Sequence, residues 1–341
     1  MKTRELLPLL VCTLVTSVGQ AALVWRPGEG WVNESSGQTL AASDAKAALE
    51  IARNMEAKEA WKEAADAYRT IVRRWPLSSA AGESQFKLGY MQERMGEFWP
   101  AYKAYQLVVD KYPGSPFFDL AIERQYSIGN LYLSGEPQRI WKIPLLPSMD
   151  KTVEIFDSVI KNAPYGSYAA AAHFKKGLAR EKQKNWSQAI EAYVDLIDRY
   201  PRSDLADDAQ YQIGYAWYQA SSDPDYDQSA ATKSIEAFQE FTIRYPNSEK
   251  IAQANTYIND LTERRVQGSY NIARFYEGQN NLKAALIYYN EVVRQDPESK
   301  QGQDARKRLE NLRARLGQDA TLEPPTPAPA TEAGVVTTSG L

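Results

Sequence analysis

The sequence predicts an all-α fold: a superhelical solenoid of about six helix-turn-helix repeats. Three features recur together, namely a proline, an aromatic residue eight positions before it, and a large apolar residue five positions before it. The prolines are Pro76, Pro113, Pro164, Pro201, Pro246 and Pro297. The aromatic residues are Tyr68, Tyr105, Phe156, Tyr193, Phe238 and Tyr289, and the apolar residues are Ile71, Val108, Val159, Leu196, Phe241 and Val292.

Each of these prolines is expected to mark the end of a helix. Residues three, four or eight positions apart lie on one side of an α-helix, so the aromatic and apolar residues predict its packing face. Proline has no N–H and clashes with the preceding turn, so the helix stops there. In five of the six repeats a serine two positions later is expected to cap the next helix by accepting a backbone hydrogen bond, whereas after Pro164 the serine lies one position further on, at Ser167. The five serines are Ser78, Ser115, Ser203, Ser248 and Ser299.

The helix before each proline-ended helix carries a small residue. The small residues are Ala52, Gly89, Gly129, Gly177, Gly214 and Ala273, and in four repeats they lie 24 positions before the proline. Glycine inside a helix costs about 1 kcal/mol relative to alanine, so its recurrence predicts close approach of the partner helix. Alanines twelve positions before the proline fit the same close approach: Ala64, Ala101, Ala189 and Ala285. Over residues 44–316 this pattern resembles the tetratricopeptide repeat (TPR), which implies a concave binding groove.

Two repeats carry insertion loops, at about residues 134–149 and 221–228. The first loop is apolar, with Trp141, Ile143, Leu145 and Leu146 as its candidate docking residues. Exposed apolar side chains commonly mark a contact with a partner or a membrane surface, so the loop is a candidate for either. The alternative is that these side chains fold back over the repeats.

The two ends of the chain do not follow the repeat pattern. Residues 1–21, with Lys2 and Arg4 before an apolar stretch, read as a signal peptide for export; a frayed cytoplasmic end is the alternative. Cys12, the single cysteine, follows Val11 rather than a small residue, so the match to a lipid-attachment motif is poor. Residues 22–43 are expected to form an extended arm. The Pro-, Thr- and Ala-rich residues 317–341 are expected to be disordered.

The composition argues against catalysis and against nucleic acid as the main partner. The net charge is −3 and the charges are interspersed, whereas phosphate binding needs a concentrated basic face. The single histidine, His173, lies four positions before Gly177 and is expected to be structural. With no histidine pair, no cysteine in the exported chain and no phosphate-binding loop, we expect no metal, no cofactor and no enzyme activity.

Exported repeats that end in Tyr-Pro-x-Ser resemble one family, the outer-membrane assembly lipoproteins of the BamD type. The resemblance is carried by residues 110–115, 198–203 and 241–248, by the long helical stretch after them, and by residues 270–276 and 284–285. It implies a periplasmic protein, associated with the outer membrane, in β-barrel protein assembly. Its early repeats would receive unfolded outer-membrane proteins, and its last repeat would dock the barrel-forming assembly subunit. The alternative is a periplasmic adaptor for cell-wall synthesis or polysaccharide export enzymes.

Repeat geometry also predicts which side chains face the groove. Positions one and five after the small residue tend toward the concave side of such repeats, which selects Arg53, Tyr90, Arg94 and Asn130, with Glu93 close by. Arginine and tyrosine are good anchors for a bound peptide because they combine a broad contact surface with polar atoms. The alternative is that these are ordinary solvated side chains.

Overall fold

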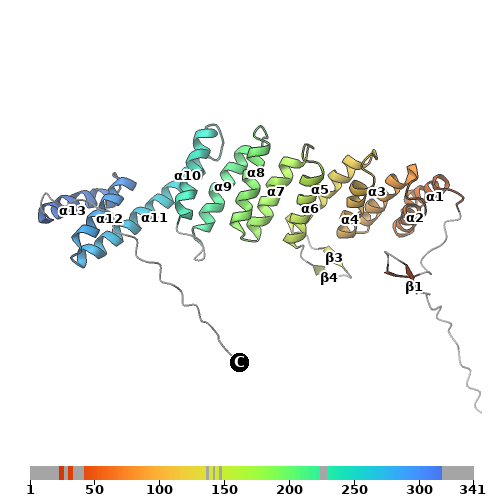
Figure 1. Cartoon of the computed structure of the whole chain (residues 1–341), viewed down its shortest axis with the longest axis horizontal. Coiled ribbons are helices and arrows are strands. Elements are labelled where there is room, and N and C mark those ends of the chain that lie inside the picture. The colour runs from red at the N-terminus through yellow and green to blue at the C-terminus, as the bar shows by residue number, and fades with distance from the viewer. Residues whose placement is uncertain are drawn as a thin grey trace, which may run out of the picture. The chain divides into compact units, whose positions relative to one another are not determined.

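A computed structural model of the chain describes thirteen helices and four short strands (Figure 1). The described residues are 23–26, 30–33, 42–135, 138–140, 143–145, 148–222 and 229–316. They divide into two compact units. The first unit holds the described residues up to 128 together with 138–140 and 143–145, and the second holds residues 129–135 and those from 148 to 316.

Within each unit the helices form antiparallel hairpins, and each described hairpin consists of a first and a second helix. The first helices are α1 (Ala45–Ala57), α3 (Ser79–Arg94), α5 (Phe118–Ser134), α7 (Ala169–Lys182), α9 (Ala206–Ala220) and α11 (Ile251–Gly278). The second helices are α2 (Trp61–Arg74), α4 (Phe98–Lys111), α6 (Met149–Asn162), α8 (Trp186–Arg199), α10 (Ala230–Arg244) and α12 (Leu282–Gln295). A final helix, α13 (Lys300–Leu316), packs on α12. The repeated hairpins are those of a TPR solenoid, as the sequence predicts.

The second helices end where the prolines predict. Their C-terminal capping residues are Trp75, Tyr112, Ala163, Tyr200, Tyr245 and Asp296, each directly before its proline. The aromatic residues eight positions before the prolines are all fully buried. The proline therefore sets the length of each second helix, and the buried ring anchors it to the first.

The small residues of the first helices lie against these rings. A Cβ atom built on Gly89 would stand 2.7 Å from Tyr105 Cε1, and one on Gly177 would stand 2.3 Å from Tyr193 Cε1. Gly129 meets Phe156 and Gly214 meets Phe238 in the same way, at 2.7 and 2.6 Å. These distances are too short for a methyl group, so the glycines are required by the close approach of the two helices.

The expectation that the serines cap the following helices is wrong for most of them. Only Ser299 acts as expected, accepting from the N–H of Gly302 in the first turn of α13. Ser115 and Ser203 accept instead from the residue two positions on, before the helix begins, and Ser78 donates to the Trp75 carbonyl. After Ser115 and Ser203 a further turn precedes the helix, so the serine stabilises that turn.

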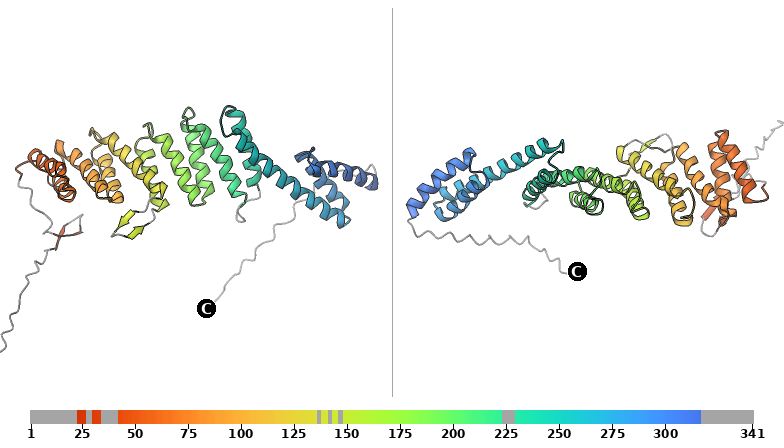
Figure 2. Two further views of the ribbon diagram at one scale, coloured as in Figure 1. Left: turned by 180° about the vertical axis from the view of Figure 1, so that it is seen from behind. Right: turned by 90° about the horizontal axis from the view of Figure 1, so that it is seen from above.

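Helix α11 joins the expected linking stretch and the first helix of the last repeat without a break (Figure 2). Gly268 lies in its middle, and a Cβ atom there would meet nothing within 4 Å. Leu261 and Val266 are buried on its apolar side. The linking segment is therefore a continuous extension of the last hairpin.

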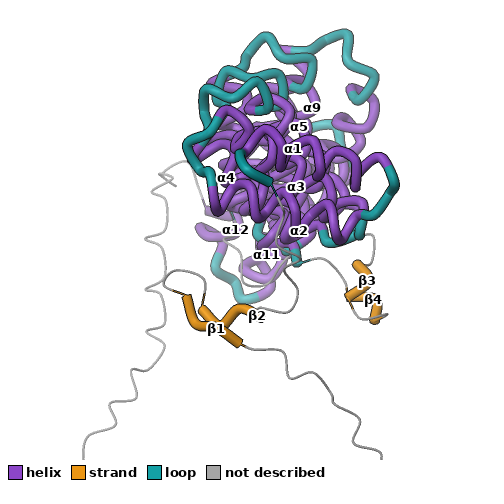
Figure 3. Tube along the Cα trace, turned by 90° about the vertical axis from the view of Figure 1, so that its right-hand side faces the viewer, coloured by secondary structure: helices purple, strands orange, loops and turns teal. Residues whose placement is uncertain are grey.

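The strands form two small antiparallel hairpins, coloured orange in Figure 3. In the expected N-terminal arm, β1 (Leu23–Arg26) pairs with β2 (Gly30–Asn33), with Trp25 opposite Trp31. In the first insertion, β3 (Gln138–Ile140) pairs with β4 (Ile143–Leu145). The expected signal peptide with Cys12, most of the 221–228 insertion and the C-terminal tail lie outside the described residues.

Candidate protein-binding surfaces

A hydrogen bond between a buried tyrosine and a glutamate recurs in four hairpins. The tyrosine is the buried ring of the second helix, and the glutamate lies four positions after the small residue of the first helix. The pairs are Tyr68–Glu56, Tyr105–Glu93, Tyr193–Glu181 and Tyr289–Glu277, each with the hydroxyl donating to the carboxylate. Burial raises the pKa of the tyrosines, so they stay protonated as donors.

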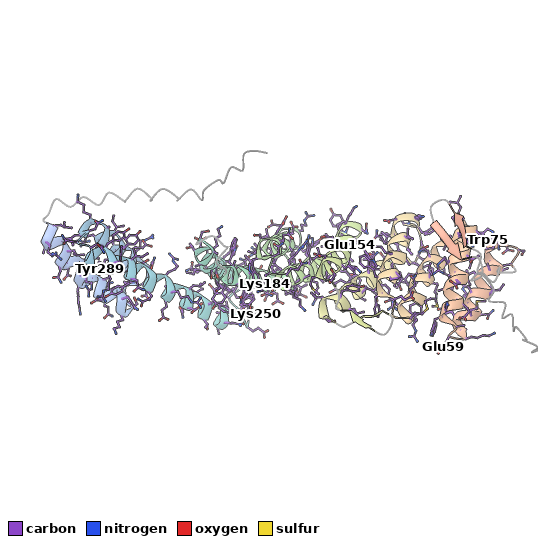
Figure 4. All side chains as sticks on the ribbon, turned by 90° about the horizontal axis from the view of Figure 1, so that it is seen from below. Glu59, Trp75, Glu154, Lys184, Lys250 and Tyr289 are labelled. Carbon is purple, nitrogen blue, oxygen red and sulfur yellow. The ribbon has the colours of Figure 1, made fainter. Side chains whose placement is uncertain are left out.

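The next first helix, or α13 in the last repeat, supplies a cation to three of these glutamates. Lys87 Nζ lies 2.7 Å from Glu56, Arg124 Nε lies 3.8 Å from Glu93, and a terminal guanidinium nitrogen of Arg308 lies 2.9 Å from Glu277. In every case the cation is 31 positions after the glutamate. Tyrosine, glutamate and cation thus form a polar triad that links successive hairpins within each unit; Figure 4 labels Tyr289 of the last one.

The two hairpins with phenylalanine at the buried position lack this triad. The glutamate position is Leu133 where the ring is Phe156, and Tyr218 where the ring is Phe238. Tyr218 instead donates to Asp260 Oδ2 over 3.0 Å, and it lies against Tyr257 and Arg264. A hydroxyl therefore occurs on the buried ring only where a carboxylate is present to accept from it.

Two of the predicted groove residues, Tyr90 and Glu93, come together around Arg124. The Arg124 guanidinium carbon lies 5.4 Å from the centre of the Tyr90 ring, and Lys87 Nζ lies 5.6 Å from it. Glu93 is partly buried, and burial raises its pKa although Tyr105 and Arg124 act in the opposite direction. This cluster lies in the first unit and pairs an aromatic face with charges of both signs.

The other predicted groove residues are not part of this cluster. Arg53 is exposed and binds Glu83 through Nε and a terminal nitrogen, at 3.0 and 2.7 Å, and also contacts Glu50. Arg94 lies over the ring of Trp61 in α2, 4.8 Å from its centre. Asn130 belongs to the second unit and is half-buried in α5. Their role in a groove stays a prediction.

The predicted docking loop is only partly described. Ile143 and Leu145 lie in strand β4, and for them the structure describes the backbone alone. Trp141 and Leu146 lie outside the described residues. The docking role of this loop therefore stays a prediction as well.

An exposed apolar pair lies on the last first helix. Ile272 is 42% exposed and Phe275 is 60% exposed, one helical turn apart on α11. Phe275 contacts Tyr276, which stacks on Tyr288 of α12 with ring centres 5.6 Å apart. Ile272 and Phe275 are the large apolar side chains of this hairpin that are exposed among the described residues, so this patch is available for contact with another molecule.

A basic pocket opens between α2, α3 and α4 in the first unit, with a volume of about 530 Å³. Its lining includes Arg69, Arg73, Lys103 and Lys111 and holds no carboxylate. Gln92, also in the lining, has a buried Oε1 atom without a hydrogen-bond partner among the described residues. The charge of this lining suits an acidic group rather than a basic one.

Sequence reasoning missed the polar triads. Their signal is present in the sequence as three spacings, of 12 residues from glutamate to tyrosine, four from small residue to glutamate, and 31 from glutamate to cation. His173 lies on the packing side of its helix, as the sequence predicts. Its side chain is 2% exposed and lies against Tyr200. Among the described residues no group of three or more His, Cys, Asp or Glu side chains is arranged to hold a metal ion.

The hairpins and their packing define a repeat protein of the TPR class, and the tetratricopeptide repeat model matches residues 83–115. The model of the outer membrane lipoprotein family YfiO matches residues 147–324, which is more than half of the chain. The chain therefore belongs to the YfiO family of outer membrane lipoproteins. Within the described helices, none is both long and apolar enough to cross a membrane.

Two curated relatives bear the name outer membrane protein assembly factor BamD. The protein from Caulobacter vibrioides is 23% identical over 144 residues, which cover 42% of this chain and 47% of that protein. The protein from Rickettsia prowazekii is 21% identical over 143 residues, covering 42% of this chain and 57% of that protein. The chain thus spans about half the length of these relatives.

Among solved structures, a tetratricopeptide repeat protein from Parabacteroides merdae is 11% identical. The match covers 80% of this chain and 99% of that chain, with a TM-score of 0.35. The C-terminal part of a TPR protein from Cytophaga hutchinsonii is 13% identical, with 78% and 88% covered and the same TM-score. The fold assignment itself rests on the hairpin packing described above.

Proposed function

We propose that this chain is a non-catalytic TPR scaffold that acts in the assembly of outer-membrane β-barrel proteins. Its membership of the outer membrane lipoprotein family and its similarity to two assembly factors support this proposal. It would work in the periplasm, at the outer membrane, by holding proteins rather than by transforming a substrate.

The observation that carries the proposal is the exposed pair Ile272 and Phe275 on α11. It lies within the residues matched by the family model, on the last hairpin. An aromatic side chain that is 60% exposed beside stacked tyrosines is a typical anchor for a protein interface. We assign to this patch the docking of a barrel-forming assembly subunit.

The early hairpins would receive unfolded barrel proteins. The cluster of Tyr90, Glu93 and Arg124 offers an aromatic face and charges in one place. Such a mixture suits extended segments, which present polar backbone and alternating apolar side chains. Arg53 and Arg94 would extend this surface in the first unit.

The test is photo-crosslinking in cells with a photoreactive phenylalanine analogue at position 275. We expect a crosslink to a β-barrel assembly subunit. Ile243 on α10 offers a matched control, because it is 81% exposed and apolar but lies on another hairpin. Equal crosslinking from both positions, or capture from position 275 of a cell-wall or polysaccharide-export enzyme instead, would overturn the assignment.

A further inference from the structure

We propose that Glu181, in α7, is a receptor for a basic side chain, lysine or arginine, of a polypeptide bound to the scaffold. This inference rests on the proposed function in one respect, that the chain holds protein segments. It adds the chemistry of one contact, which the family match does not specify.

The four tyrosine–glutamate pairs differ in whether a cation lies beside the carboxylate. Three of the glutamates have a cation 31 positions later, at Lys87, Arg124 and Arg308. The equivalent position for Glu181 is Gln212, on α9. The Gln212 side chain interacts with the Tyr193 hydroxyl but carries no charge. The fourth triad therefore has the carboxylate and the hydroxyl, with a neutral amide in place of the cation.

No other basic side chain takes this place. Among the described residues Glu181 forms no ion pair, and its hydrogen-bond partner is Tyr193, at 2.9 Å. The basic residues around it on α7 are engaged elsewhere: Lys182 Nζ donates to the Leu133 carbonyl, Arg180 donates to Gln183, and Lys176 pairs with Asp157. Lys184, labelled in Figure 4, lies in the turn after α7 and forms no ion pair with Glu181.

The electrostatic state of Glu181 agrees with a carboxylate that has no cation beside it. Burial raises its pKa to about 7, and the hydrogen bond from Tyr193 only partly opposes this effect. A cation within ion-pair distance favours the charged carboxylate and lowers the pKa of such a group. A bound lysine or arginine would therefore ionise Glu181 fully at neutral pH.

Glu181 is within reach of a partner. Its side chain is half-buried, as are the carboxylates of the filled triads, whose side chains are 13–25% exposed. In those triads a side chain from the neighbouring helix reaches the carboxylate. A basic side chain of similar length from a bound segment would take this place at Glu181 by displacing the Gln212 amide.

The chain supplies its own matched variants for the test. Gln212→Lys would fill the position internally, and Glu181→Gln would remove the acceptor charge. Lys87→Gln would open a second such position, at Glu56, in a hairpin where the wild-type protein has none. All are made in the full chain, and circular dichroism confirms that each variant folds.

The first readout is binding to arrayed peptides from unfolded β-barrel proteins, each paired with a copy in which lysine and arginine are replaced by glutamine. We expect the wild type to prefer the basic peptides about tenfold, as charge-assisted contacts do. Gln212→Lys and Glu181→Gln should lose this preference. Lys87→Gln keeps Glu181 and opens a second position at Glu56, so its preference should be stronger than that of the wild type. An unchanged preference in Gln212→Lys would overturn the proposal.

The second readout does not depend on the proposed function. Argininamide is titrated into carbon-13-labelled protein, and the pKa of Glu181 is followed by NMR. We expect argininamide to lower this pKa in the wild type. In Gln212→Lys the pKa should already be low, and argininamide should change it little. A wild-type pKa that does not respond would overturn the proposal. If no peptide binds but argininamide lowers the pKa of Glu181, the proposed scaffold function is wrong, whereas the proposal that Glu181 accepts a cation holds.

Discussion

Gly177 in α7 and Tyr193 in α8 occupy adjoining space: a Cβ atom on Gly177 would stand 2.3 Å from Tyr193 Cε1. The ring is fully buried, and its hydroxyl is held by Glu181 one turn further along α7. One helix therefore supplies both the space for the ring and the acceptor for its hydroxyl. This arrangement explains why the small residue, the glutamate and the tyrosine recur together.

The first prediction concerns this close approach. Replacement of Gly177 by alanine should lower the free energy of unfolding by about 1–3 kcal/mol, because the buried ring has to move. Gly268→Ala in α11 is the matched control, since a Cβ atom there meets nothing within 4 Å. Alanine favours the helix at that position and should raise stability by about 0.5–1 kcal/mol. Urea denaturation measures the free energy of unfolding of each variant. Equal changes of the same sign in the two variants would contradict the close contact of Gly177 with the Tyr193 ring.

The second prediction tests the pairing of hydroxyl and carboxylate. Phe156→Tyr buries a hydroxyl where the glutamate position is Leu133, and should cost about 1–3 kcal/mol. Leu133→Glu alone should also destabilise the chain. The double variant should recover about 1 kcal/mol or more of the summed loss, because the new hydroxyl can donate to the new carboxylate. Strictly additive losses in a double-mutant cycle would argue against a direct pair.

The third prediction concerns pH. The pKa of Glu181 is raised from 4.5 to about 7 by burial, so between these values the folded chain holds a proton that the unfolded chain has released. The free energy of unfolding should therefore fall as the pH rises through this window. Glu181→Gln removes the effect, since the amide still accepts from Tyr193. We expect the variant to be more stable than the wild type by about 3 kcal/mol at pH 8 and equal to it at pH 4. A constant difference across this range would contradict the raised pKa.

The fourth prediction concerns His173. This position lies four residues before the small residue, where α3 and α9 carry Gln85 and Gln210. Gln85 Nε2 donates to the Ala104 carbonyl over 2.9 Å, whereas neither ring nitrogen of His173 has a partner among the described residues. His173→Gln should donate to the equivalent Ala192 carbonyl and stabilise the chain by about 1 kcal/mol at pH 8.

The advantage of His173→Gln should grow in acid. Burial lowers the pKa of His173 below 6.5, so the folded chain keeps it neutral where the unfolded chain is protonated. The neutral His173 imidazole therefore makes its full contribution to the free energy of unfolding above pH 6.5. This contribution is lost as the pH falls through the lowered pKa. Thermal unfolding of both proteins from pH 5 to 8 measures the difference. An advantage that shrinks toward pH 5 would contradict a buried neutral histidine.

The fold was predictable because it depends on short sequence distances. The prolines end α2 and α4 at Arg74 and Lys111, and the spacing of the buried rings follows from the 3.6-residue turn. The serine caps failed at Ser115 and Ser203 because an additional turn separates these residues from the next helix. The length of such a turn depends on how the hairpins stack. A local sequence pattern therefore does not predict it.

The candidate site was predictable only in part. Tyr90 and Glu93 were both selected by the repeat spacing, but Arg124, which lies against both of them, was not. Arg94 has the same spacing rule as Tyr90 and yet lies over Trp61 of the preceding helix. An arginine side chain is long and flexible, so its contacts depend on which groups the neighbouring helices bring close to it. The spacing of residues along one helix does not predict those groups.

By itself, the sequence determined where each second helix ends, which face of each helix is buried and that the hairpins repeat, because these properties depend on neighbours within one or two turns. Only the tertiary structure decided that Lys87 contacts Glu56 and that Arg308 contacts Glu277, whereas Glu181 has no ion-pair partner within the described part of the chain. Those contacts join residues 31 positions apart on successive hairpins. Their geometry is set by the offset between stacked helices, which arises only when the buried rings and the small residues have packed together.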